Sequence, residues 1–450
     1  MNIHIRRAVA FLLIITFFIV APILLLYTAG YRYNIKKQEV QKTGSLVLNS
    51  KPTGATITLN NKPISEKTAI RLNNIVPDDY LINIAKDGYY PWEKKLSVKA
   101  QETTFAENII LFKKSEPEKI SNQQIEKIIF SPNNKNACYW VKNNNKYNLY
   151  LLNLSNQKEK LLSENIDSFD NTNISWAPDD SKFILNTGNK YFINFAVLPY
   201  QTVDITNIII KNKLKNIRWD IDTSNVLYAQ DNNTVYVIDI LSLSINKKYT
   251  LNAGTNLIDY IVFQNEVFTI ENTNTDFNLT KHSLNPELKN TLYNNIELNG
   301  DNYSISSIQN YKLIFADNKN PTLFFSDLDL GSILYQKSNV LTIRPEYKQN
   351  LLLLTTNQEL SYLNLSSSPL QEKNITRYSQ GLGEAYWHKS VNYVFALQNN
   401  KIDIIELDDR DRHLVTTLPI DNVTSFSLNA DGNTIFFVKD KNLYSLQIMD

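Results

Sequence analysis

The sequence is poor in the residues that build disulfides and metal sites. Its single cysteine, Cys138, excludes an intrachain disulfide, and its four histidines are scattered without the spacing of metal ligands. We therefore expect no metal and no cofactor, and we expect stability to come from burial and backbone pairing. Cys138 stands in the apolar run ACYWV and is expected to be a small core residue.

An excess of charge of one sign is also missing. The 46 Lys and Arg residues balance 45 Asp and Glu residues, so the surface carries no net field that would attract a polyanion such as DNA. A nucleic-acid partner is therefore not expected.

One long apolar run stands out near the start of the chain. Residues 8–29 read AVAFLLIITFFIVAPILLLYTA without a charge, and a helix of this length crosses a bilayer core of about 30 Å. Transmembrane helices tolerate a proline such as Pro22, and Tyr27 suits the aromatic belt at the membrane interface. We predict a single-pass transmembrane helix at 8–29 and a juxtamembrane linker at 30–43.

The charges that flank this run do not decide its orientation, since two arginines before it face three basic residues after it, Arg32, Lys36 and Lys37. A hydrophobic segment this close to the start commonly directs the export of the chain that comes after it. We therefore predict a location at the cell membrane, with residues 1–7 cytoplasmic and the C-terminal ectodomain outside the cytoplasm. The alternative is a cleaved signal peptide, but the run is longer than a usual signal core.

Residues 44–112 alternate apolar and polar side chains in short runs separated by turns. The runs are GSLVLNS, ATITLNN, YLINIAKD, EKKLSVKA and ENIILF. A period of two predicts half-buried strands. We therefore predict a small antiparallel sheet or β-sandwich of about 70 residues.

The motifs of this segment resemble those of PEGA domains in bacterial and archaeal envelope proteins, which are named after a Pro-Glu-Gly-Ala turn. Thr53 replaces the glutamate of that turn, and Asp78 replaces a glycine that is usual later in the family pattern. The resemblance implies an envelope-associated domain and carries no catalytic residue. The residues that form the turn and a second Gly-Tyr motif are Pro52, Thr53, Gly54, Ala55, Gly88 and Tyr89.

Three aromatic residues lie close together just after the third of these runs. Tyr89, Tyr90 and Trp92 could stack on a sugar or on a partner protein and are our candidate ligand contacts. The alternative is that they pack on the sheet, since aromatic residues favour strands.

The strand NLYLLNL at residues 148–154 returns several times in the remaining sequence. Clear copies are TVYVIDI from Thr234, ELSYLNL from Glu359, KIDIIEL from Lys401 and NLYSLQI from Asn442. Their spacings are close to multiples of 42 residues, and weaker copies near positions 191, 276 and 318 complete the series. The 450-residue chain therefore carries about eight repeat units after the small β domain.

Each unit contains further apolar runs and a turn such as SPNN, APDD or NADG. Four short strands in about 42 residues, with no helical pattern, are typical of a β-propeller blade. The turns resemble the Ser-Pro-Asp-Gly turn of TolB-like propellers, relatives of the WD-repeat class. We predict an all-β protein with an eight-bladed propeller at 123–450, or a seven-bladed one if the poor unit near 276 is an insertion. Residues 113–122 are a linker whose segment from Glu116 is a candidate for the outer strand that the last unit lacks.

Nothing in the propeller region points to a catalytic constellation. The charged run ELDDRDRHL from Glu406 is expected to be a solvent-exposed outer hairpin. We therefore predict no catalytic residue and a non-catalytic platform that binds or scaffolds a protein or a cell-wall glycan. The alternative is a glycan-active hydrolase or lyase, which needs two carboxylates close together in the central channel.

Overall fold

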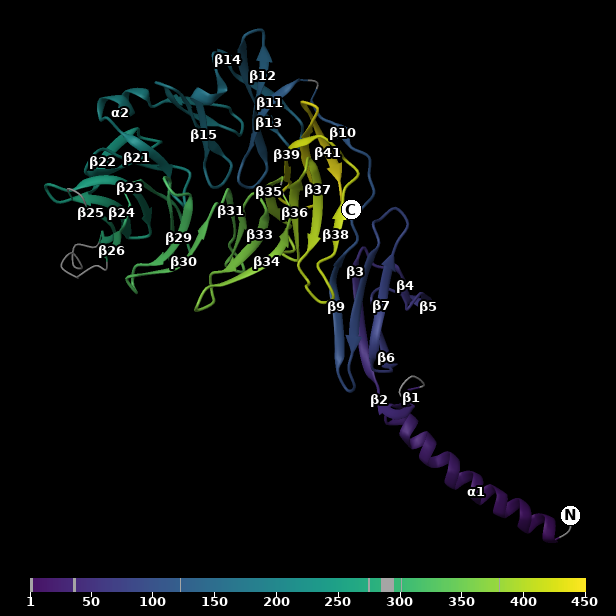
Figure 1. The fold of residues 1–450 in the computed structure, drawn as a ribbon. Coiled ribbons are helices and arrows are strands. Elements are labelled where there is room, and N and C mark those ends of the chain that lie inside the picture. The colour runs from purple at the N-terminus through teal and green to yellow at the C-terminus, as the bar shows by residue number, and fades with distance from the viewer. Residues whose placement is uncertain are drawn as a thin grey trace. The chain divides into compact units, whose positions relative to one another are not determined.

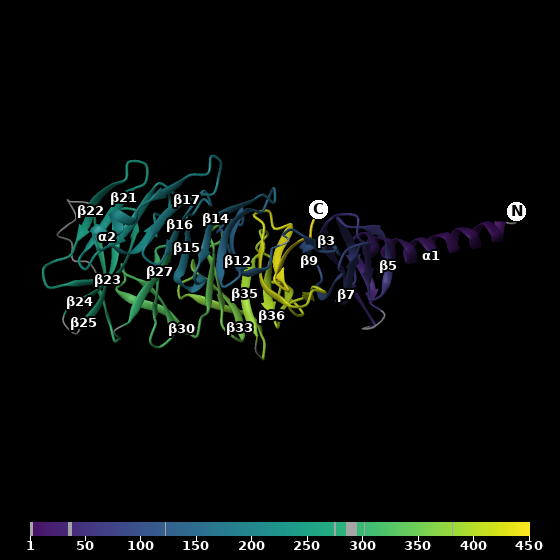
Figure 2. The same cartoon turned by 90° about the horizontal axis from the view of Figure 1, so that it is seen from above.

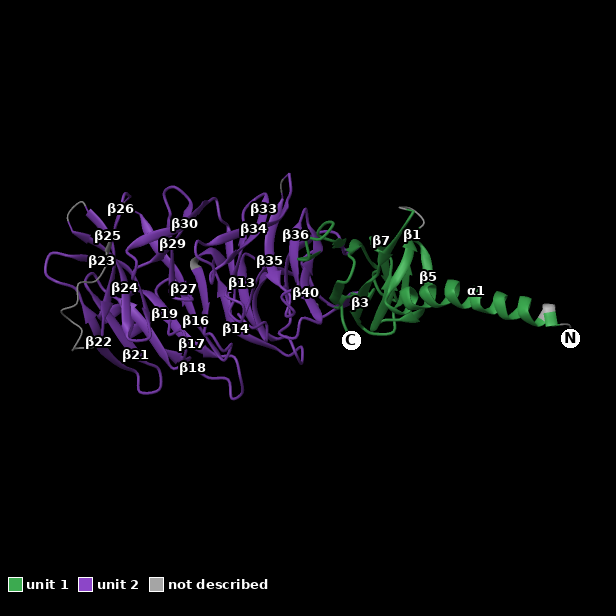
Figure 3. Ribbon diagram, turned by 90° about the horizontal axis from the view of Figure 1, so that it is seen from below, with its two compact units in different colours: residues 1–116, 405–416, 447–450 green, residues 117–404, 417–446 purple. Residues whose placement is uncertain are grey.

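The computed structural model describes residues 3–34, 38–121, 123–273, 276–284, 295–300, 302–379 and 381–450. Lys36 and Lys37, two of the basic residues after the apolar run, and Asn122, the end of the predicted linker, lie outside the described residues. The chain divides into two compact units (Figure 3). Unit 1 comprises Met1–Glu116, Ile405–Thr416 and Gln447–Asp450, and unit 2 comprises Pro117–Ile404 and Thr417–Leu446.

Unit 1 begins with the apolar helix α1 (Ile3–Thr28), which is continuous through Pro22 (Figure 2). Its segment Arg6–Thr28 has a mean hydropathy of 3.1 and is long and apolar enough to cross a membrane. None of that segment is buried against the rest of the described chain. The predicted linker after it holds a two-stranded antiparallel hairpin of β1 (Tyr31–Asn34) and β2 (Glu39–Lys42).

Two sheets follow, with the strand orders β6-β3-β9 and β5-β4-β7-β8. Leu46, Leu48, Ile57 and Ile84 belong to one core cluster drawn from both sheets, as the alternation in the sequence predicts. The strands of the two sheets are β3 (Gly44–Lys51), β4 (Thr56–Leu59), β5 (Lys62–Lys67), β6 (Ile70–Ile75), β7 (Asp78–Ala85), β8 (Trp92–Val98) and β9 (Thr103–Ile110).

The β domain differs from the expected one in two respects. Strands β5 and β6 were not expected. Strand β5 has an exposed side chain at almost every position and so shows no alternation, and β6 alternates only between half-buried and exposed side chains. Strands β3 and β9 pair in parallel rather than antiparallel. A period of two places side chains on alternating faces but does not encode strand direction.

Unit 2 contains eight four-stranded sheets among the described residues, and they follow one another in a series (Figure 1). We number them one to eight along the chain. Sheets one to four are β11 (Ile125–Phe130), β12 (Asn136–Asn143), β13 (Lys146–Asn153), β14 (Glu159–Ile166); β15 (Thr172–Trp176), β16 (Lys182–Thr187), β17 (Tyr191–Phe195), β18 (Thr202–Asp204); β19 (Lys215–Trp219), β20 (Val226–Gln230), β21 (Thr234–Asp239), β22 (Ser244–Thr250); and β23 (Asn256–Phe263), β24 (Glu266–Thr273), β25 (Asp276–Ser283), β26 (Asn295–Leu298).

The remaining sheets repeat the same arrangement of antiparallel neighbours. Sheets five to seven are β27 (Tyr303–Gln309), β28 (Lys312–Asp317), β29 (Thr322–Asp327), β30 (Ser332–Ser338); β31 (Thr342–Glu346), β32 (Leu351–Thr355), β33 (Glu359–Asn364), β34 (Gln371–Arg377); and β35 (Leu382–Trp387), β36 (Tyr393–Gln398), β37 (Lys401–Glu406), β38 (Val415–Thr417). The repeated sequence of residues 148–154 thus occupies the third strand of its sheet, β13.

Sheet eight is made from the two ends of this region. It joins β39 (Val423–Leu428), β40 (Thr434–Lys439) and β41 (Asn442–Gln447) to β10 (Glu118–Lys119). Glu118 pairs with Ser445 and Lys119 pairs with Tyr444, antiparallel. The backbone N–H of Ile120 also donates to the carbonyl of Leu443, at 2.9 Å.

Apolar side chains pack each sheet on the next. Residues of sheets two and three share one core cluster, for example Ile184 and Leu227, and Tyr386 of sheet seven contacts Phe426 of sheet eight with ring centroids 5.1 Å apart. Tyr139 of sheet one shares a cluster with Phe436 of sheet eight. The series of sheets therefore returns to its start, which is the arrangement of a β-propeller.

Among the residues of unit 2 that the structure describes, two short helices interrupt the strands, although the sequence shows no helical pattern there. They are the 3-10 turn η1 (Phe169–Asn171) and the helix α2 (Thr206–Lys211). Six residues are too few to show a helical period in the sequence. Ile209 of α2 is buried in the cluster between sheets two and three.

Candidate functional site

A polar row crosses the face of sheet two that is turned toward sheet three. Asn173 of β15 lies opposite Asn186 of β16, and Asn186 lies opposite Tyr191 of β17. Residues directly opposite in neighbouring strands point to the same face. Two residues further along the strands, Ile184 on this same face belongs to the apolar core between the two sheets.

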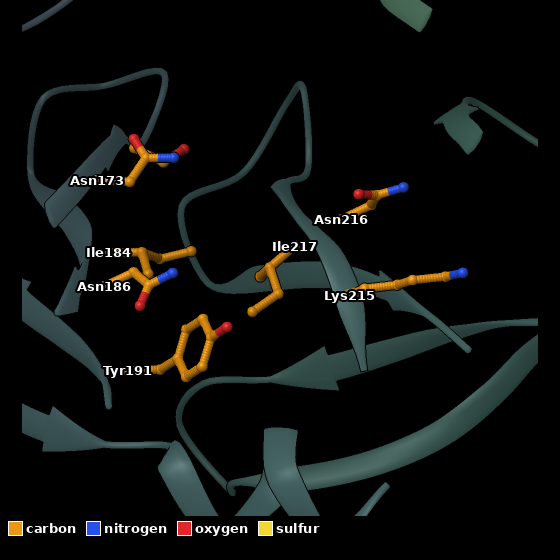
Figure 4. Close-up of a pocket in the computed structure, with 8 residues that line it drawn as sticks. Asn173, Ile184, Asn186, Tyr191, Lys215, Asn216 and Ile217 are labelled. Atoms are coloured by element: carbon orange, nitrogen blue, oxygen red, sulfur yellow. The ribbon is translucent and has the colours of Figure 1, made fainter. Parts of the chain in front are cut away.

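This row lines a pocket of about 240 Å³ within unit 2 (Figure 4). Strand β19 of sheet three supplies the opposite side, and in Figure 4 Ile217 faces Tyr191 and Asn186. Among the residues that the structure describes, no acidic side chain lines the pocket. Its lining residues are Asn173, Ser175, Ile184, Asn186, Tyr191, Lys215, Asn216 and Ile217.

The lining part of β19 is irregular. Its pairing with β20 shifts between Lys215 and Arg218, and Asn216 between them has a positive φ of 50°. Such a β-bulge re-aims the side chains of the extra residues. Lys215 Nζ donates to Asn232 Oδ1 at 3.3 Å, and in Figure 4 its side chain points away from the polar row. The polar row therefore carries no charged side chain, and Lys215 is the one charged residue in the described lining.

Four carboxylates lie on the described first strands of the sheets, Glu126, Asp259, Glu346 and Glu384. Asp259 of β23 is buried and receives two hydrogen bonds from Arg218 Nη2, at 2.9 and 2.7 Å. Glu384 of β35 accepts from the Tyr386 hydroxyl at 2.7 Å and from Ser425 Oγ at 3.0 Å. The bonds from Arg218 and Ser425 link neighbouring sheets, and the bond from Tyr386 lies within β35. None of these bonds joins one carboxylate to another.

A further cluster of polar side chains joins sheets three and four. The Tyr249 hydroxyl lies 2.8 Å from His282 Nδ1, and His282 Nε2 contacts the carboxylate of Glu271. The rings of Tyr249 and His282 are stacked, with centroids 4.6 Å apart. Across the residues that the structure describes, no group of three or more His, Cys, Asp or Glu side chains could hold a metal ion.

The PEGA-like turn of unit 1 is closed by hydrogen bonds to Thr68. The N–H of Gly54 donates to the Thr68 carbonyl at 2.6 Å, and the N–H of Ala55 donates to Thr68 Oγ1 at 3.0 Å. Gly54 has a φ of 77°, a left-handed conformation that favours glycine. Pro52 accepts a hydrogen bond from Ser50 and Thr53 accepts one from Lys86, both at the main-chain carbonyl.

The three candidate aromatics do not form one exposed cluster. Trp92 is only 2% exposed and belongs to the core between the sheets, because it begins β8 on the inward face. Tyr89 and Tyr90 are partly exposed, and the Tyr89 hydroxyl donates to the carboxylate of Asp450. That hydrogen bond raises the pKa of Tyr89. A ligand contact stays a prediction for the two tyrosines.

The charged run from Glu406 is solvent-exposed at residues 409–412, as the sequence predicts, but its two ends are buried or half-buried. Glu406 is buried, and its Oε1 accepts a hydrogen bond from Trp92 Nε1 at 2.9 Å. Lys94 Nζ donates to the Asp408 carbonyl at 2.6 Å, and Arg410 donates to the Phe105 carbonyl at 2.8 Å. The run packs on the β domain because its charges find partners there that are distant in the sequence.

The pocket residues were not among our predicted site residues. The sequence contains only a weak indication of this pocket, because Asn186 is an ordinary polar residue near the end of the strand KFILNT. Only the strand register places it between Asn173 and Tyr191.

Comparisons with known proteins give a match over part of the chain. Residues 43–109 match the PEGA domain family. No curated protein matches the sequence. The similar solved structures include the WD40 domain of SCAP from fission yeast (13% identity, 74% of this chain, 94% of that chain, TM-score 0.45) and the C-terminal WD40 domain of Sif2 (10% identity, 75% and 99%, TM-score 0.45).

Proposed function

We propose that this protein is a membrane-anchored envelope protein whose PEGA domain and propeller form a non-catalytic binding or scaffolding platform outside the cytoplasm. In this proposal α1 spans the membrane with residues 1–7 in the cytoplasm. The eight sheets of unit 2 are the eight blades of one TolB-like propeller. The segment around β10 closes the ring by completing the last blade.

The observation that carries the proposal is that β10, from the start of the repeat region, completes sheet eight at its end. Pairing of Glu118 with Ser445 joins the two ends of the repeat region within one sheet. A closed ring leaves few free strand edges and presents many loops on a rigid frame, which suits recognition of a partner. The exposed, apolar α1 supports attachment to a membrane, because its side chains have no other cover in the described chain.

The local hydrogen bonds of Asp259 and Glu384 favour this proposal over a glycan-active enzyme. Glycoside hydrolysis uses two carboxylates that flank one bond and are free to exchange protons with it. Here Arg218 pairs with Asp259, with Nη2 2.7 Å from Oδ2. Such a pairing serves to join sheets three and four.

The proposal is tested by site-specific photo-crosslinking of the full-length chain in its own cells. A benzophenone amino acid is placed at loop tips of unit 2, where exposure is between 69% and 75%: Leu198, Leu241 and Leu330. The matched control is the same substitution at Val40 of unit 1, which is also exposed. Crosslinked proteins are identified by mass spectrometry after separation of membranes.

A platform predicts one recurrent partner from adjacent unit 2 positions, recovered with the membrane fraction. Crosslinks from Val40 alone, or a chain found in the soluble fraction without its N-terminal segment, would contradict the proposal. The first result would move binding away from the propeller, and the second would make α1 a cleaved signal.

A further inference from the structure

We infer that the pocket between sheets two and three is a binding site for a single neutral sugar ring. The inference rests on the proposed binding role of the propeller and names the ligand class for one site on it. Three properties of the pocket support it: its structural origin, its lining and its size.

The pocket exists because of one short side chain. Phe183 lies opposite Trp176 in sheet two, and Leu227 lies opposite Trp219 in sheet three. Asn186 and Gln230 each come three residues later and therefore occupy the same place in their sheets. The side chain of Gln230 reaches sheet four, whereas the shorter side chain of Asn186 does not fill the space beside sheet three.

In sheet three the Gln230 side chain fills the space between its own sheet and sheet four. Gln230 is fully buried, and its Nε2 donates to the carbonyls of Leu257 and Ile258 on the first strand of sheet four, at 3.1 and 3.2 Å. Asn186 is one methylene shorter, and its Oδ1 is buried without a hydrogen-bond donor among the described residues. The space that Gln230 fills beside sheet four stays open beside β19.

The groups that line this space match the surface of a sugar. A side-chain amide offers both donors and an acceptor, which suits neighbouring hydroxyl groups, and Asn173 and Asn186 each carry one. The third lining amide, Asn216, already donates from Nδ2 to the Ile258 carbonyl of sheet four, at 3.3 Å. Ile184 and Ile217 are apolar, and the ring of the nearby tyrosine adds a flat face of the kind that packs on ring C–H groups.

An ionic ligand is disfavoured at this site. The described lining includes no acid, and its one lysine, Lys215, is bonded to Asn232 outside the polar row. A cation that entered the pocket would lose water without gaining a partner of opposite charge. An anion seated on the polar row would gain none there either, because the Lys215 side chain points away from that row. The ligand is expected to be neutral.

The size of the pocket restricts the ligand further. Its 240 Å³ is below the roughly 300–1,000 Å³ of sites for drug-sized molecules. One pyranose ring, either free or at the end of a glycan chain, is therefore the ligand that we assign.

The test uses the full-length chain in lipid nanodiscs and saturation-transfer NMR titrations with glucose and N-acetylglucosamine. Asn186→Gln should place an amide against β19 as Gln230 does beside sheet four, and so fill the pocket. We expect binding to weaken about tenfold or more, as for the loss of one or two hydrogen bonds. The matched control is Asn145→Gln, at an exposed turn residue of sheet one, which should bind like the wild type.

A second variant guards against misfolding of the first. Tyr191→Val introduces the residue that sheet three has at the same place, Val235, and should also weaken binding while the far-UV circular dichroism of the folded chain stays unchanged. Chitotriose, a short chain of N-acetylglucosamine, identifies the source of the ring. Tighter binding than the monosaccharide indicates a glycan end, and equal binding indicates a free sugar; both support the site.

Three results would overturn the inference. They are no binding of either sugar at tens of millimolar, equal binding by wild type and Asn186→Gln, and preferential binding of the peptide mimic N-acetylglycine methylamide. None of them affects the crosslinking test of the platform, which does not depend on this pocket. Failure of the sugar site and failure of the proposed function are therefore distinguishable.

Discussion

Lys94 Nζ lies 2.6 Å from Glu406 Oε2, and the two side chains are only 0% and 6% exposed. Strand β8 supplies the lysine and the end of β37 supplies the glutamate. Trp92 Nε1 donates to the other carboxylate oxygen, at 2.9 Å. Removing one partner of such a pair leaves an uncompensated buried charge, which costs much more than the pair itself contributes.

We therefore predict that Lys94→Met destabilises the packing of residues 405–416 on the β domain by about 3–5 kcal/mol. The double variant Lys94→Met, Glu406→Leu should recover most of this loss, because it leaves no buried charge unpaired. Hydrogen exchange of the peptides that cover 92–98 and 405–416 measures both effects on the full-length chain.

The matched control for this prediction is Lys95→Met. Lys95 forms an ion pair with Asp79 at 3.1 Å, but both side chains are about half exposed. Exposed pairs contribute at most about 1 kcal/mol, so exchange should hardly change. Equal effects at Lys94 and Lys95 would show that the buried pair has no special role.

The same segment should loosen in acid. Burial alone would raise the pKa of Asp408, but hydrogen bonds from Arg410 outweigh burial and hold the pKa below its ordinary value. A group with a depressed folded-state pKa stabilises the fold above its unfolded pKa of about 3.9, and this contribution is lost as the pH falls through the folded value. The loss should therefore begin only below about pH 4.

Asp408→Asn tests this prediction, because it removes the titrating group and keeps the shape. Protection of residues 405–416 against hydrogen exchange, corrected for the intrinsic pH dependence of exchange, should fall less steeply in acid for the variant than for the wild type. Identical slopes for the two proteins would assign the acid sensitivity to other carboxyl groups.

Cys138 provides a reporter for the stability of sheet one. It is fully buried, and burial raises the pKa of its thiol well above the ordinary value, so a thiol reagent should react only when the sheet opens. Asp180→Ala should speed this reaction. Asp180 is buried and accepts hydrogen bonds from Ser131 Oγ, Asn133 N and Lys135 N, at 2.6, 3.0 and 3.2 Å.

Loss of these bonds leaves several donors unpaired and should cost about 2 kcal/mol or more, which corresponds to a roughly 30-fold faster modification of Cys138. Asp170→Ala, at an exposed residue of η1 shortly before sheet two, is the control and should leave the rate unchanged. Rapid modification of the native wild type would show that Cys138 is not enclosed as described.

The repeat could be predicted from sequence because each unit makes the same contacts. Trp219 Nε1 donates to the carbonyl of Ser175, and Trp387 Nε1 donates to the carbonyl of Arg344, both at 2.9 Å. These partners are 44 and 43 residues apart, close to one repeat. Contacts between neighbouring units thus preserve a period that the alternation of single strands also shows.

The other features depend on partners that no local pattern indicates. The charges from Glu406 onward resemble a solvated run because Lys94 lies far away in the sequence. The pocket depends on a difference of one methylene between Asn186 and Gln230, and either residue alone is unremarkable in an apolar strand. The alternation of β3 and β9 predicts two strands but leaves their parallel pairing open.

The central claim, a membrane-anchored platform outside the cytoplasm, is tested most directly by labelling Lys142→Cys with a membrane-impermeant maleimide in spheroplasts. Lys142 is exposed at the end of β12, and the wild type, whose only thiol is the buried Cys138, serves as the unlabelled control. The account predicts full labelling before lysis and recovery of the labelled chain in carbonate-washed membranes. Labelling only after lysis, or a labelled chain in the soluble fraction, would contradict it.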